Sequence, residues 1–129
     1  MRKKVKFGYC NLTADFLHIG HIKYLKRCKD HCENLTVGIM SDECVKSYKG
    51  HYPIMNAFQR REVVKCLSMV DNVVTQNTFD FPHFIITARK FHGKNMLIFD
   101  SKEHSRKGAD CLFSYTEGIS STMYRKTLK

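Results

Sequence analysis

The sequence contains no tryptophan, only two prolines, and 12 acidic side chains against 22 basic ones. It also contains no apolar run close to the roughly 18 residues that a membrane-spanning helix needs. Basic residues stand at the N-terminus, but the apolar stretch of a secretory signal peptide does not follow them. We therefore expect a cytoplasmic protein that does not insert into a membrane.

The length of 129 residues predicts a single domain, residues 1–129, with one hydrophobic core. Hydrophobic residues make up 43% of the chain and charged residues 26%, which is typical of a folded globular protein. The formal net charge of +10 favours an anionic partner such as a nucleoside triphosphate, a nucleic acid or an acidic lipid. Because the basic residues are spread along the chain and are not interleaved with aromatic ones, the pattern argues against nucleic acid.

The six cysteines are expected to be free thiols in a reducing compartment. Cys28 and Cys32 lie four residues apart in a segment with helical periodicity, and no second Cys or His pair stands at zinc-finger spacing. We expect these two side chains to pack on a helix face, and we predict no structural metal and no disulfide.

Apolar residues recur with two periods that alternate along the chain. Short runs rich in β-branched residues predict strands, and spacings of three and four residues predict helices. Ser41 is expected to cap a short helix, and Asn56 with Gln59 forms a capping-box pattern before another. The expected strands are 5–9, 35–40, 73–74, 96–99 and 112–113, and the expected helices are 21–33, a short one after Ser41, 56–67, 81–91 and 120–128. This order predicts an α/β fold of three layers, Rossmann-like, in which a parallel sheet has helices on both faces.

A His-x-Gly-His motif lies between the first expected strand and the first expected helix. His18 and His21 are three residues apart, so both rings can face one point at the start of the helix. Backbone N–H groups and the helix dipole converge there as well, and Gly20 lets the backbone approach a phosphate without a Cβ in the way. Two imidazoles in this position suit the extra negative charge of a five-coordinate phosphorus, and no protein nucleophile is needed. The alternative interpretation is that the two histidines cap the helix or bind a metal.

Further motifs follow in order and at fitting intervals. They are Ser41-Asp42-Glu43, Lys49-Gly50, Ile54-Met55-Asn56, Arg60, Val70-Asp71 and Thr116-Glu117-Gly118-Ile119-Ser120. With the histidine motif they resemble the cytidylyltransferase family, which includes the glycerol-3-phosphate, choline-phosphate and ethanolamine-phosphate enzymes. The likeness extends over about residues 5–125. It implies the HUP type of Rossmann-like fold and a homodimer that pairs through the region of Val70-Asp71.

The resemblance also implies roles for individual residues. His18 and His21 would bind the CTP phosphates and stabilise the transition state. Lys49, on a loop after the second strand, would neutralise the α-phosphate or the phosphate of the acceptor. Arg60 would hold a phosphate from its helix, and Asp15 would lie near the acceptor. The implied nucleotide-binding positions are Gly8, Tyr9, Gly20, Asp100, Thr116, Gly118, Ile119, Ser120, Ser121, Thr122 and Arg125.

The remaining histidines and several aromatic residues match no motif of this kind. We interpret these histidines as surface or packing residues, namely His31, His51, His83, His92 and His104. Tyr48, Tyr52 and the aromatic cluster 79–84 are interpreted as core or dimer contacts and not as a platform that stacks on a base.

Two departures from the family pattern bear on the substrate. The family has a short G-x-F-D run before its first histidine, whereas Gly8 precedes His18 by ten residues, so we expect a longer loop over 9–14. Tyr115 stands where the family has an arginine directly before T-E-G-I-S. We predict that Arg125 supplies the missing positive charge, with Arg106 or Lys107 as second choice. The run 120–125 also resembles the S-x-T-x-x-R pattern of related adenylyltransferases.

These observations predict an enzyme that transfers CMP from CTP to a phosphorylated small alcohol and releases pyrophosphate, with Mg²⁺ accompanying the triphosphate. Glycerol 3-phosphate is favoured as acceptor over choline phosphate, because quaternary ammonium groups bind best to tryptophan and the chain has none. Ethanolamine phosphate and phosphonates stay open. The alternatives are an adenylyltransferase of the same superfamily, a catalytically weakened nucleotide-binding relative, and a module that binds nucleic acid.

Overall fold

A parallel β-sheet forms the centre of the protein. The computed structural model describes residues 3–114, within which five strands pair in the order β3-β2-β1-β4-β5. Each neighbouring pair is parallel, with Val5 opposite Cys32 and Phe7 opposite Met96. The strands are β1 (Val5–Leu12), β2 (Cys32–Met40), β3 (Asn72–Gln76), β4 (Met96–Ser101) and β5 (Cys111–Phe113). The helices are α1 (Ile19–Asp30), α2 (Asp42–Lys49), α3 (Ala57–Lys65) and α4 (His83–His92), followed by the 3-10 turn η1 (Gly93–Asn95).

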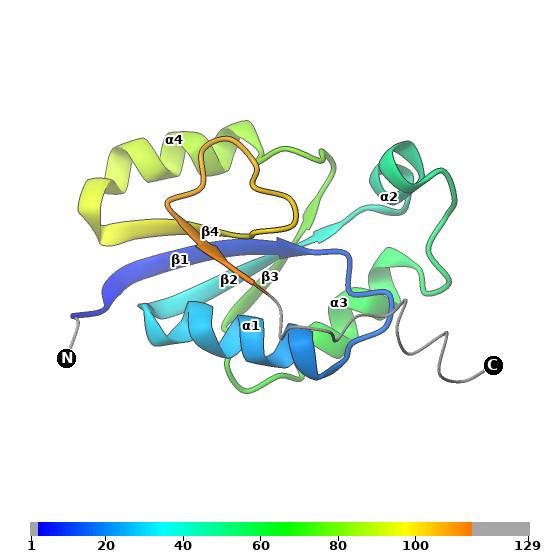
Figure 1. Ribbon diagram of the computed structural model, residues 1–129, viewed down its shortest axis with the longest axis horizontal. Coiled ribbons are helices and arrows are strands. Elements are labelled where there is room, and N and C mark those ends of the chain that lie inside the picture. Colours follow the sequence, from blue (N-terminus) through cyan, green and yellow to red (C-terminus); the bar gives the residue numbers. More distant parts are fainter. Residues whose placement is uncertain (1–2, 115–129) are drawn as a thin grey trace.

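Helices cover both faces of this sheet. In Figure 1, α4 lies above the sheet, α1 and α3 lie below it, and α2 stands beyond the arrowheads of the strands. The expected three-layer α/β architecture is therefore confirmed. The two sides of the sheet have separate apolar cores: Leu25, Leu35 and Val64 belong to the α1–α3 side, and Ile85 and Ile98 to the α4 side.

Several helix ends follow from the residues predicted to form them. The Ser41 hydroxyl accepts a hydrogen bond from Cys44 N at 3.1 Å and begins α2. Asn56 and Gln59 form the expected capping box, with distances of 2.9 and 3.0 Å, and begin α3. Gly93, with a φ of 57°, ends α4, because a left-handed backbone is strained for residues with a Cβ.

The first helix and the first strand differ in length from the prediction. Helix α1 ends at Asp30, because the His31 N–H caps the carbonyls of Cys28 and Lys29, and Cys32 already begins β2. Cys32 therefore packs from a strand and not from the same helix face as Cys28. Strand β1 continues to Leu12, so most of the expected loop 9–14 is strand. The expected helix 120–128 lies outside the described residues.

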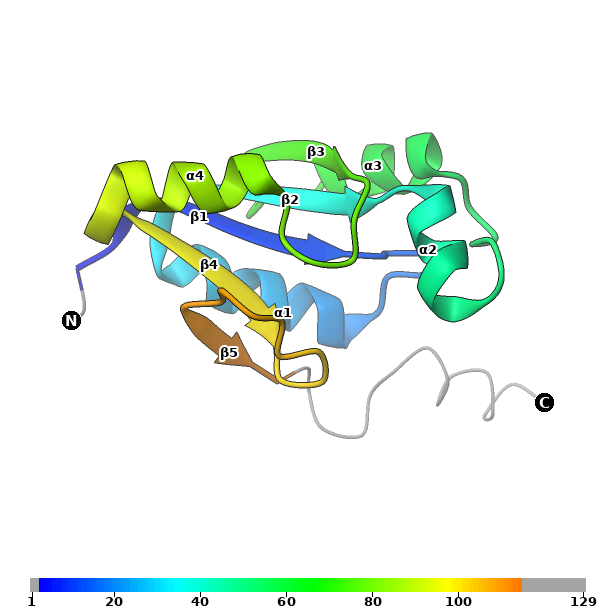
Figure 2. The same cartoon turned by 90° about the horizontal axis from the view of Figure 1, so that it is seen from above.

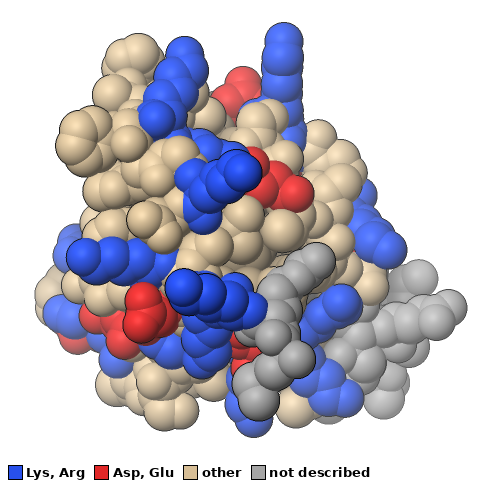
Figure 3. Space-filling view, turned by 90° about the vertical axis from the view of Figure 1, so that its left-hand side faces the viewer, with Lys and Arg blue, Asp and Glu red and all other residues tan. Residues whose placement is uncertain are grey.

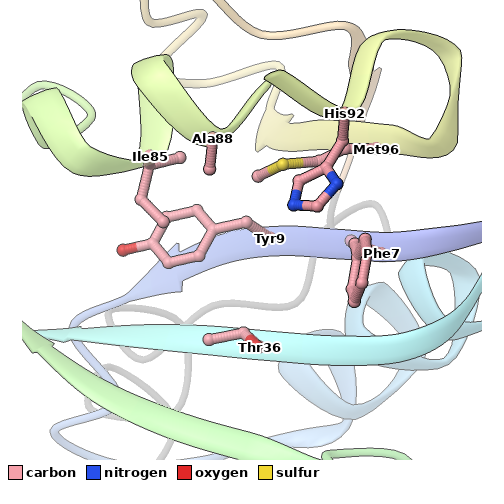
Figure 4. A pocket seen from close by; sticks show the side chains of 8 residues that line it. Phe7, Tyr9, Thr36, Ile85, Ala88, His92 and Met96 are labelled. Atoms are coloured by element: carbon pink, nitrogen blue, oxygen red, sulfur yellow. The ribbon is translucent and has the colours of Figure 1, made fainter. Parts of the chain in front are cut away.

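A hollow of about 140 Å³ remains between α4 and the sheet (Figure 4). It lies toward the amino ends of the strands, since Met96 is the first residue of β4 and Phe7 is near the start of β1. Its lining is mostly apolar and comprises Phe7, Gly8, Tyr9, Thr36, Ile85, Ala88, His92 and Met96. Across residues 3–114, the structure contains no helix both long and apolar enough to cross a membrane.

Candidate functional site

The motif residues gather at the carboxyl edge of the sheet, where ligands bind in open parallel α/β sheets. The segments that follow β1, β2, β3 and β4 all leave the sheet at this edge. Figure 2 shows the start of α1, the end of α2 and the loop after β4 on the same side of the molecule. This edge is opposite the hollow beneath α4, which therefore does not belong to the candidate site.

His18 and His21 form a pair at the start of α1. His18 is the N-cap, and its Nδ1 accepts from Gly20 N at 3.1 Å, while Nδ1 of His21 accepts from His18 N at 3.2 Å. The two ring centroids are 4.0 Å apart. Because both Nδ1 atoms accept a backbone hydrogen bond, the neutral form of each ring carries its proton on Nε2. The helix cap thus fixes two imidazoles side by side, each with an Nε2–H donor.

Lys49 belongs to the same electrostatic environment. It is the exposed last residue of α2, and not a loop residue as expected. Burial lowers the pKa of His21 to about 4, with the neighbouring His18 and Lys49 adding smaller effects in the same direction. Burial also lowers the pKa of His18. At neutral pH these rings are therefore uncharged hydrogen-bond donors, and a bound anion would raise their pKa values.

Asp15 lies in the loop between β1 and α1, next to the histidine pair. Its carboxylate accepts hydrogen bonds from Ile54 N and Met55 N at 3.0 and 2.9 Å. It thereby joins the loop 13–18 to the segment that precedes α3. Ala14, beside it, has a φ of 57°, a conformation that is strained for a residue with a Cβ. The contact of Asp15 with an acceptor stays a prediction.

Arg60 occupies a different position from the one expected. Its side chain is fully buried, and its guanidinium donates to Thr13 O at 2.8 Å, to Met55 O at 2.9 Å and to Asp42 Oδ1 at 2.7 Å. A phosphate outside the protein surface cannot reach this group. Arg60 therefore connects the loop after β1, the segment before α3 and the start of α2, and it positions the site without lining it.

Gly8 and Tyr9 also lie away from the edge, which corrects their expected role in nucleotide binding. Both are inside β1, because this strand continues to Leu12. A Cβ on Gly8 would stand 2.5 Å from Cys32 Sγ, so the glycine serves close packing within the core. Tyr9 is buried, and its hydroxyl donates to the Gln76 side chain at 2.5 Å.

Asp100, at the carboxyl end of β4, forms a buried ion pair with Arg106. The distance from Asp100 Oδ1 to Arg106 Nη1 is 2.7 Å, and the other carboxylate oxygen accepts from Arg106 N at 2.6 Å. Arg106 also donates to Phe79 O at 2.6 Å. The charge of Arg106 is therefore already compensated, so Arg106 does not fit the role of substitute for the family arginine. The carboxylate of Asp100 is likewise committed to the protein and not presented to a nucleoside.

The loop after β4 brings a further histidine to this edge. His104 is exposed and packs against Phe79 with ring centroids 5.8 Å apart, in agreement with its interpretation as a surface or packing residue. Loss of solvent contact has the largest effect on its pKa and lowers it, and Arg106 and Lys49 lower it further. Phe79 and Tyr48, interpreted as core or dimer contacts, also lie at this edge, with ring centroids 4.9 Å apart. No local sequence pattern indicates this grouping, since the three residues follow different strands.

The structure thus brings together His18, Gly20, His21 and Lys49, with Asp15 and Arg60 holding the surrounding loops. Within residues 3–114 no group of three or more His, Cys, Asp or Glu side chains could hold a metal ion. The remaining expected site residues lie outside the described residues: Tyr115, Thr116, Gly118, Ile119, Ser120, Ser121, Thr122 and Arg125. Their roles stay predictions.

Comparison with known proteins identifies relatives of this chain. It is 41% identical over 75 residues to the bifunctional protein HldE of Hyphomonas neptunium, covering 57% of the chain and 15% of the relative. It is 45% identical over 60 residues to the FAD synthase of Thermococcus sibiricus, covering 46% of the chain and 40% of the relative. The HldE protein of Aliarcobacter butzleri is 28% identical over 126 residues, which are 91% of the chain and 25% of that protein. The matched part of the chain therefore spans less than half of the length of each of these relatives.

A solved structure and a family model complete the comparison. The lipopolysaccharide core biosynthesis protein from Thermoplasma volcanium has the same fold, with a TM-score of 0.66 over 86% of this chain and 98% of that one, at 20% identity. The model of the cytidylyltransferase-like family matches residues 10–127, which include the histidine motif and the T-E-G-I-S run. The chain therefore belongs to the cytidylyltransferase-like family of nucleotidyltransferases.

Proposed function

We propose that this chain transfers a nucleoside monophosphate from a nucleoside triphosphate to a phosphorylated acceptor and releases pyrophosphate. The observation that carries the proposal is the His18–His21 pair, whose rings lie 4.0 Å apart at the start of α1 with Lys49 close by. Neutral Nε2–H donors and an ammonium group at the positive end of a helix dipole together suit several phosphate oxygens.

The reaction needs no protein nucleophile. A phosphate oxygen of the acceptor attacks the α-phosphorus, and the bond from that phosphorus to the oxygen bridging the α- and β-phosphates breaks. The bonding electrons leave with pyrophosphate, so negative charge grows on the oxygens around the α-phosphorus and on the leaving group. His18 and His21 would donate to these oxygens, and Lys49 would neutralise one of them. Placement and charge compensation are sufficient for this type of transfer.

Mg²⁺ would accompany the triphosphate. The residues 3–114 provide no cluster of metal ligands, and the carboxylates near the site are engaged, Asp15 by backbone N–H groups and Asp100 by Arg106. Such a donor set fits an ion held chiefly by phosphate oxygens and water, as Mg²⁺ commonly is.

We propose CTP as the donor and a small phosphorylated alcohol such as glycerol 3-phosphate as the acceptor. The T-E-G-I-S run at 116–120 and the family description support CTP. ATP is the second candidate, because the name of FAD synthase denotes an adenine dinucleotide as product and because the run 120–125 fits the adenylyltransferase pattern. A homodimer that pairs near Val70-Asp71 is part of the same proposal.

The decisive experiment measures pyrophosphate release from CTP and from ATP, each with Mg²⁺, across a panel of phosphorylated alcohols and phosphonates. The His18→Asn and His21→Asn variants serve as controls for contaminating activity. We expect turnover with one nucleotide and one acceptor class, and a loss of about 10²–10³-fold in kcat in each variant. If the protein turns over ATP and not CTP, the proposed nucleotide donor is ATP. Absence of both turnover and nucleotide binding with every pair would overturn the proposed function.

A further inference from the structure

The loop after β4 presents His104 in a fixed orientation. Ser101, the buried last residue of β4, has its Oγ 2.8 Å from His104 Nδ1. The backbone closes the same turn, since His104 N and Ser105 N both donate to Ser101 O, at 3.2 and 3.0 Å. Ser105 has a φ of 47°, a conformation sparsely populated by residues with a Cβ. The turn therefore holds the imidazole by one of its nitrogens and leaves Nε2 as the second polar atom of the ring.

Aromatic contacts fix the position of this ring relative to α2. The ring centroids of His104 and Phe79 are 5.8 Å apart in an edge-on arrangement, and Phe79 contacts Tyr48 at 4.9 Å. The guanidinium of Arg106 lies over the same Phe79 ring, 4.2 Å from its centroid. Tyr48 directly precedes Lys49 in α2. His104 is thus connected through two ring contacts to the end of the helix that carries Lys49.

Charged groups of both signs act on His104. Partial burial has the largest effect on its pKa and lowers it, and Arg106 and Lys49 lower it further. Asp100 and Glu103 act in the opposite direction, but Asp100 is paired with Arg106. When the Ser101 hydroxyl donates to Nδ1, the neutral ring carries its proton on Nε2 and can donate it to an anion. The contacts of His104 with Phe79 and of Phe79 with Tyr48 place this ring at the end of α2 that carries Lys49.

We propose that His104 binds a phosphate group of the nucleotide together with Lys49, as a third imidazole of the site. This inference rests on the proposed function and adds a residue to it. The ligand is the anionic part of the nucleotide, so pyrophosphate alone should engage the same residue. Ser101 acts as a positioning residue, since it orients the ring and does not itself reach the ligand.

Calorimetric titration of the full chain with two probes tests this assignment: the Mg²⁺ complex of the preferred nucleoside triphosphate, and inorganic pyrophosphate. For His104→Ala we expect about tenfold weaker binding of both probes, because the variant loses one hydrogen bond to a charged group. His104→Gln, whose side-chain amide can donate from near the position of Nε2, should recover part of the affinity. Ser101→Ala should give a smaller loss than His104→Ala.

His92→Gln is the matched control, because His92 lies at the amino end of the sheet in the lining of the apolar hollow. It should bind both probes like the wild type. Unchanged pyrophosphate affinity in His104→Ala would overturn the inference, and a loss confined to the nucleotide would overturn it too by assigning His104 to the base or sugar. If circular dichroism shows that His104→Ala does not fold, the His104→Gln and Ser101→Ala variants are titrated instead. Pyrophosphate affinity equal to that of the wild type in both variants would then overturn the inference. Wild-type protein that neither turns over nor binds a nucleotide would instead refute the proposed function itself.

Discussion

His18 and His21 combine a structural and a chemical task in the same atoms. The His18 Nδ1 accepts from Gly20 N in the first turn of α1, and the His21 Nδ1 accepts from the N–H of the N-cap, His18. That commitment fixes the tautomer, so the neutral ring carries its proton on Nε2. The two interpretations that the sequence allowed, a helix cap and a phosphate site, are therefore compatible, because they use different nitrogens of the same rings.

The low pKa of His21 predicts a pH-dependent stability. The ordinary histidine pKa near 6.5 falls to about 4 in the folded protein without ligand. As the pH falls from 6.5 toward 4, the unfolded chain takes up a proton that folded His21 does not, so the free energy of unfolding decreases. This residue accounts for at most about 2–3 kcal/mol of that decrease. Urea unfolding of His21→Asn at pH 7.5, 5.5 and 4.5 should show a weaker pH dependence than the wild type.

The control for this measurement is His83→Asn, since His83 is exposed at the start of α4. It should retain the pH dependence of the wild type. Equal slopes in the wild type and in His21→Asn would mean that the ring is as readily protonated in the folded state as in the unfolded chain.

The sequence predicted those site residues whose geometry is local. His18, Gly20 and His21 lie within one turn of helix, so their spacing alone brings them together. The burial of Arg60 was not predicted, because its three partners are residues 13, 42 and 55 and no local pattern connects them. The sequence did not predict that His104 lies at the carboxyl edge. Its contact with Phe79 joins segments that follow different strands, so it depends on the order of the strands in the sheet.

The loops at the carboxyl edge are held by side chains from neighbouring elements. Arg60 of α3 joins Thr13, which follows β1, to Asp42, which begins α2. Asp15 adds two hydrogen bonds between the loop after β1 and the segment before α3. These contacts fix the distance between the start of α1 and α2, and hence the distance between the histidine pair and Lys49.

Replacing Arg60 by lysine distinguishes a positioning role from direct phosphate binding. Lysine keeps the charge but cannot donate to three partners in the directions that the guanidinium serves. We expect Arg60→Lys to lose about 2–4 kcal/mol of unfolding free energy, because buried acceptors are left without their donors. Thermal or urea unfolding measures the effect, and Lys65→Arg, on the exposed end of α3, is the control. A variant as stable as the wild type, with only a raised KM for the nucleotide, would restore Arg60 as a phosphate ligand.

The buried pair of Asp100 and Arg106 connects the end of β4 to the loop that carries His104. Removing Arg106 alone would leave a carboxylate that is 1% exposed without its cation. We expect Arg106→Met to cost about 3–5 kcal/mol of unfolding free energy, and the double variant with Asp100→Asn to cost less. Chemical unfolding of the single and double variants provides the measurement. A single variant as stable as the wild type would show that the Arg106 charge is not needed to balance Asp100.

Element order and helix caps were predictable, whereas element ends depended on packing. Ser41, Asn56 and Gly93 act within one or two residues of their own position, so their effect is visible in the sequence. The extension of β1 to Leu12 and of β2 back to Cys32 comes from pairing between strands, in which Leu12 lies opposite Ile39 and Val5 opposite Cys32. Such pairing has no local sequence signal.

The positive charge of the molecule is not confined to the candidate site. Figure 3 looks at the amino ends of the strands and shows Lys and Arg side chains spread over that face, with Asp and Glu among them. A net charge of +10 distributed in this way raises the local concentration of any small anion, and the attraction decreases with ionic strength. Selectivity for a nucleotide must therefore come from the geometry of the carboxyl edge and not from the overall charge.

The arrangement of the sheet predicts that residues 3–114 unfold as one unit. Strand β1 lies in the middle of the sheet and pairs with both β2 and β4, so neither half can separate without breaking its central strand. Both apolar cores also share this strand, through Cys10 on one side and Tyr9 on the other. A small domain of this kind is expected to show a single cooperative transition.

The absence of tryptophan makes this cooperativity directly measurable, because tyrosine emission is not masked. Tyr9 and Tyr24 are buried on opposite sides of the sheet, so their fluorescence reports on both cores. Urea unfolding followed by tyrosine fluorescence and by far-ultraviolet circular dichroism should give coincident curves, and Tyr9→Phe should shift both midpoints equally. Separate midpoints for the two signals would show that the chain contains more than one folding unit, because a shared central strand cannot be lost from one core and kept in the other.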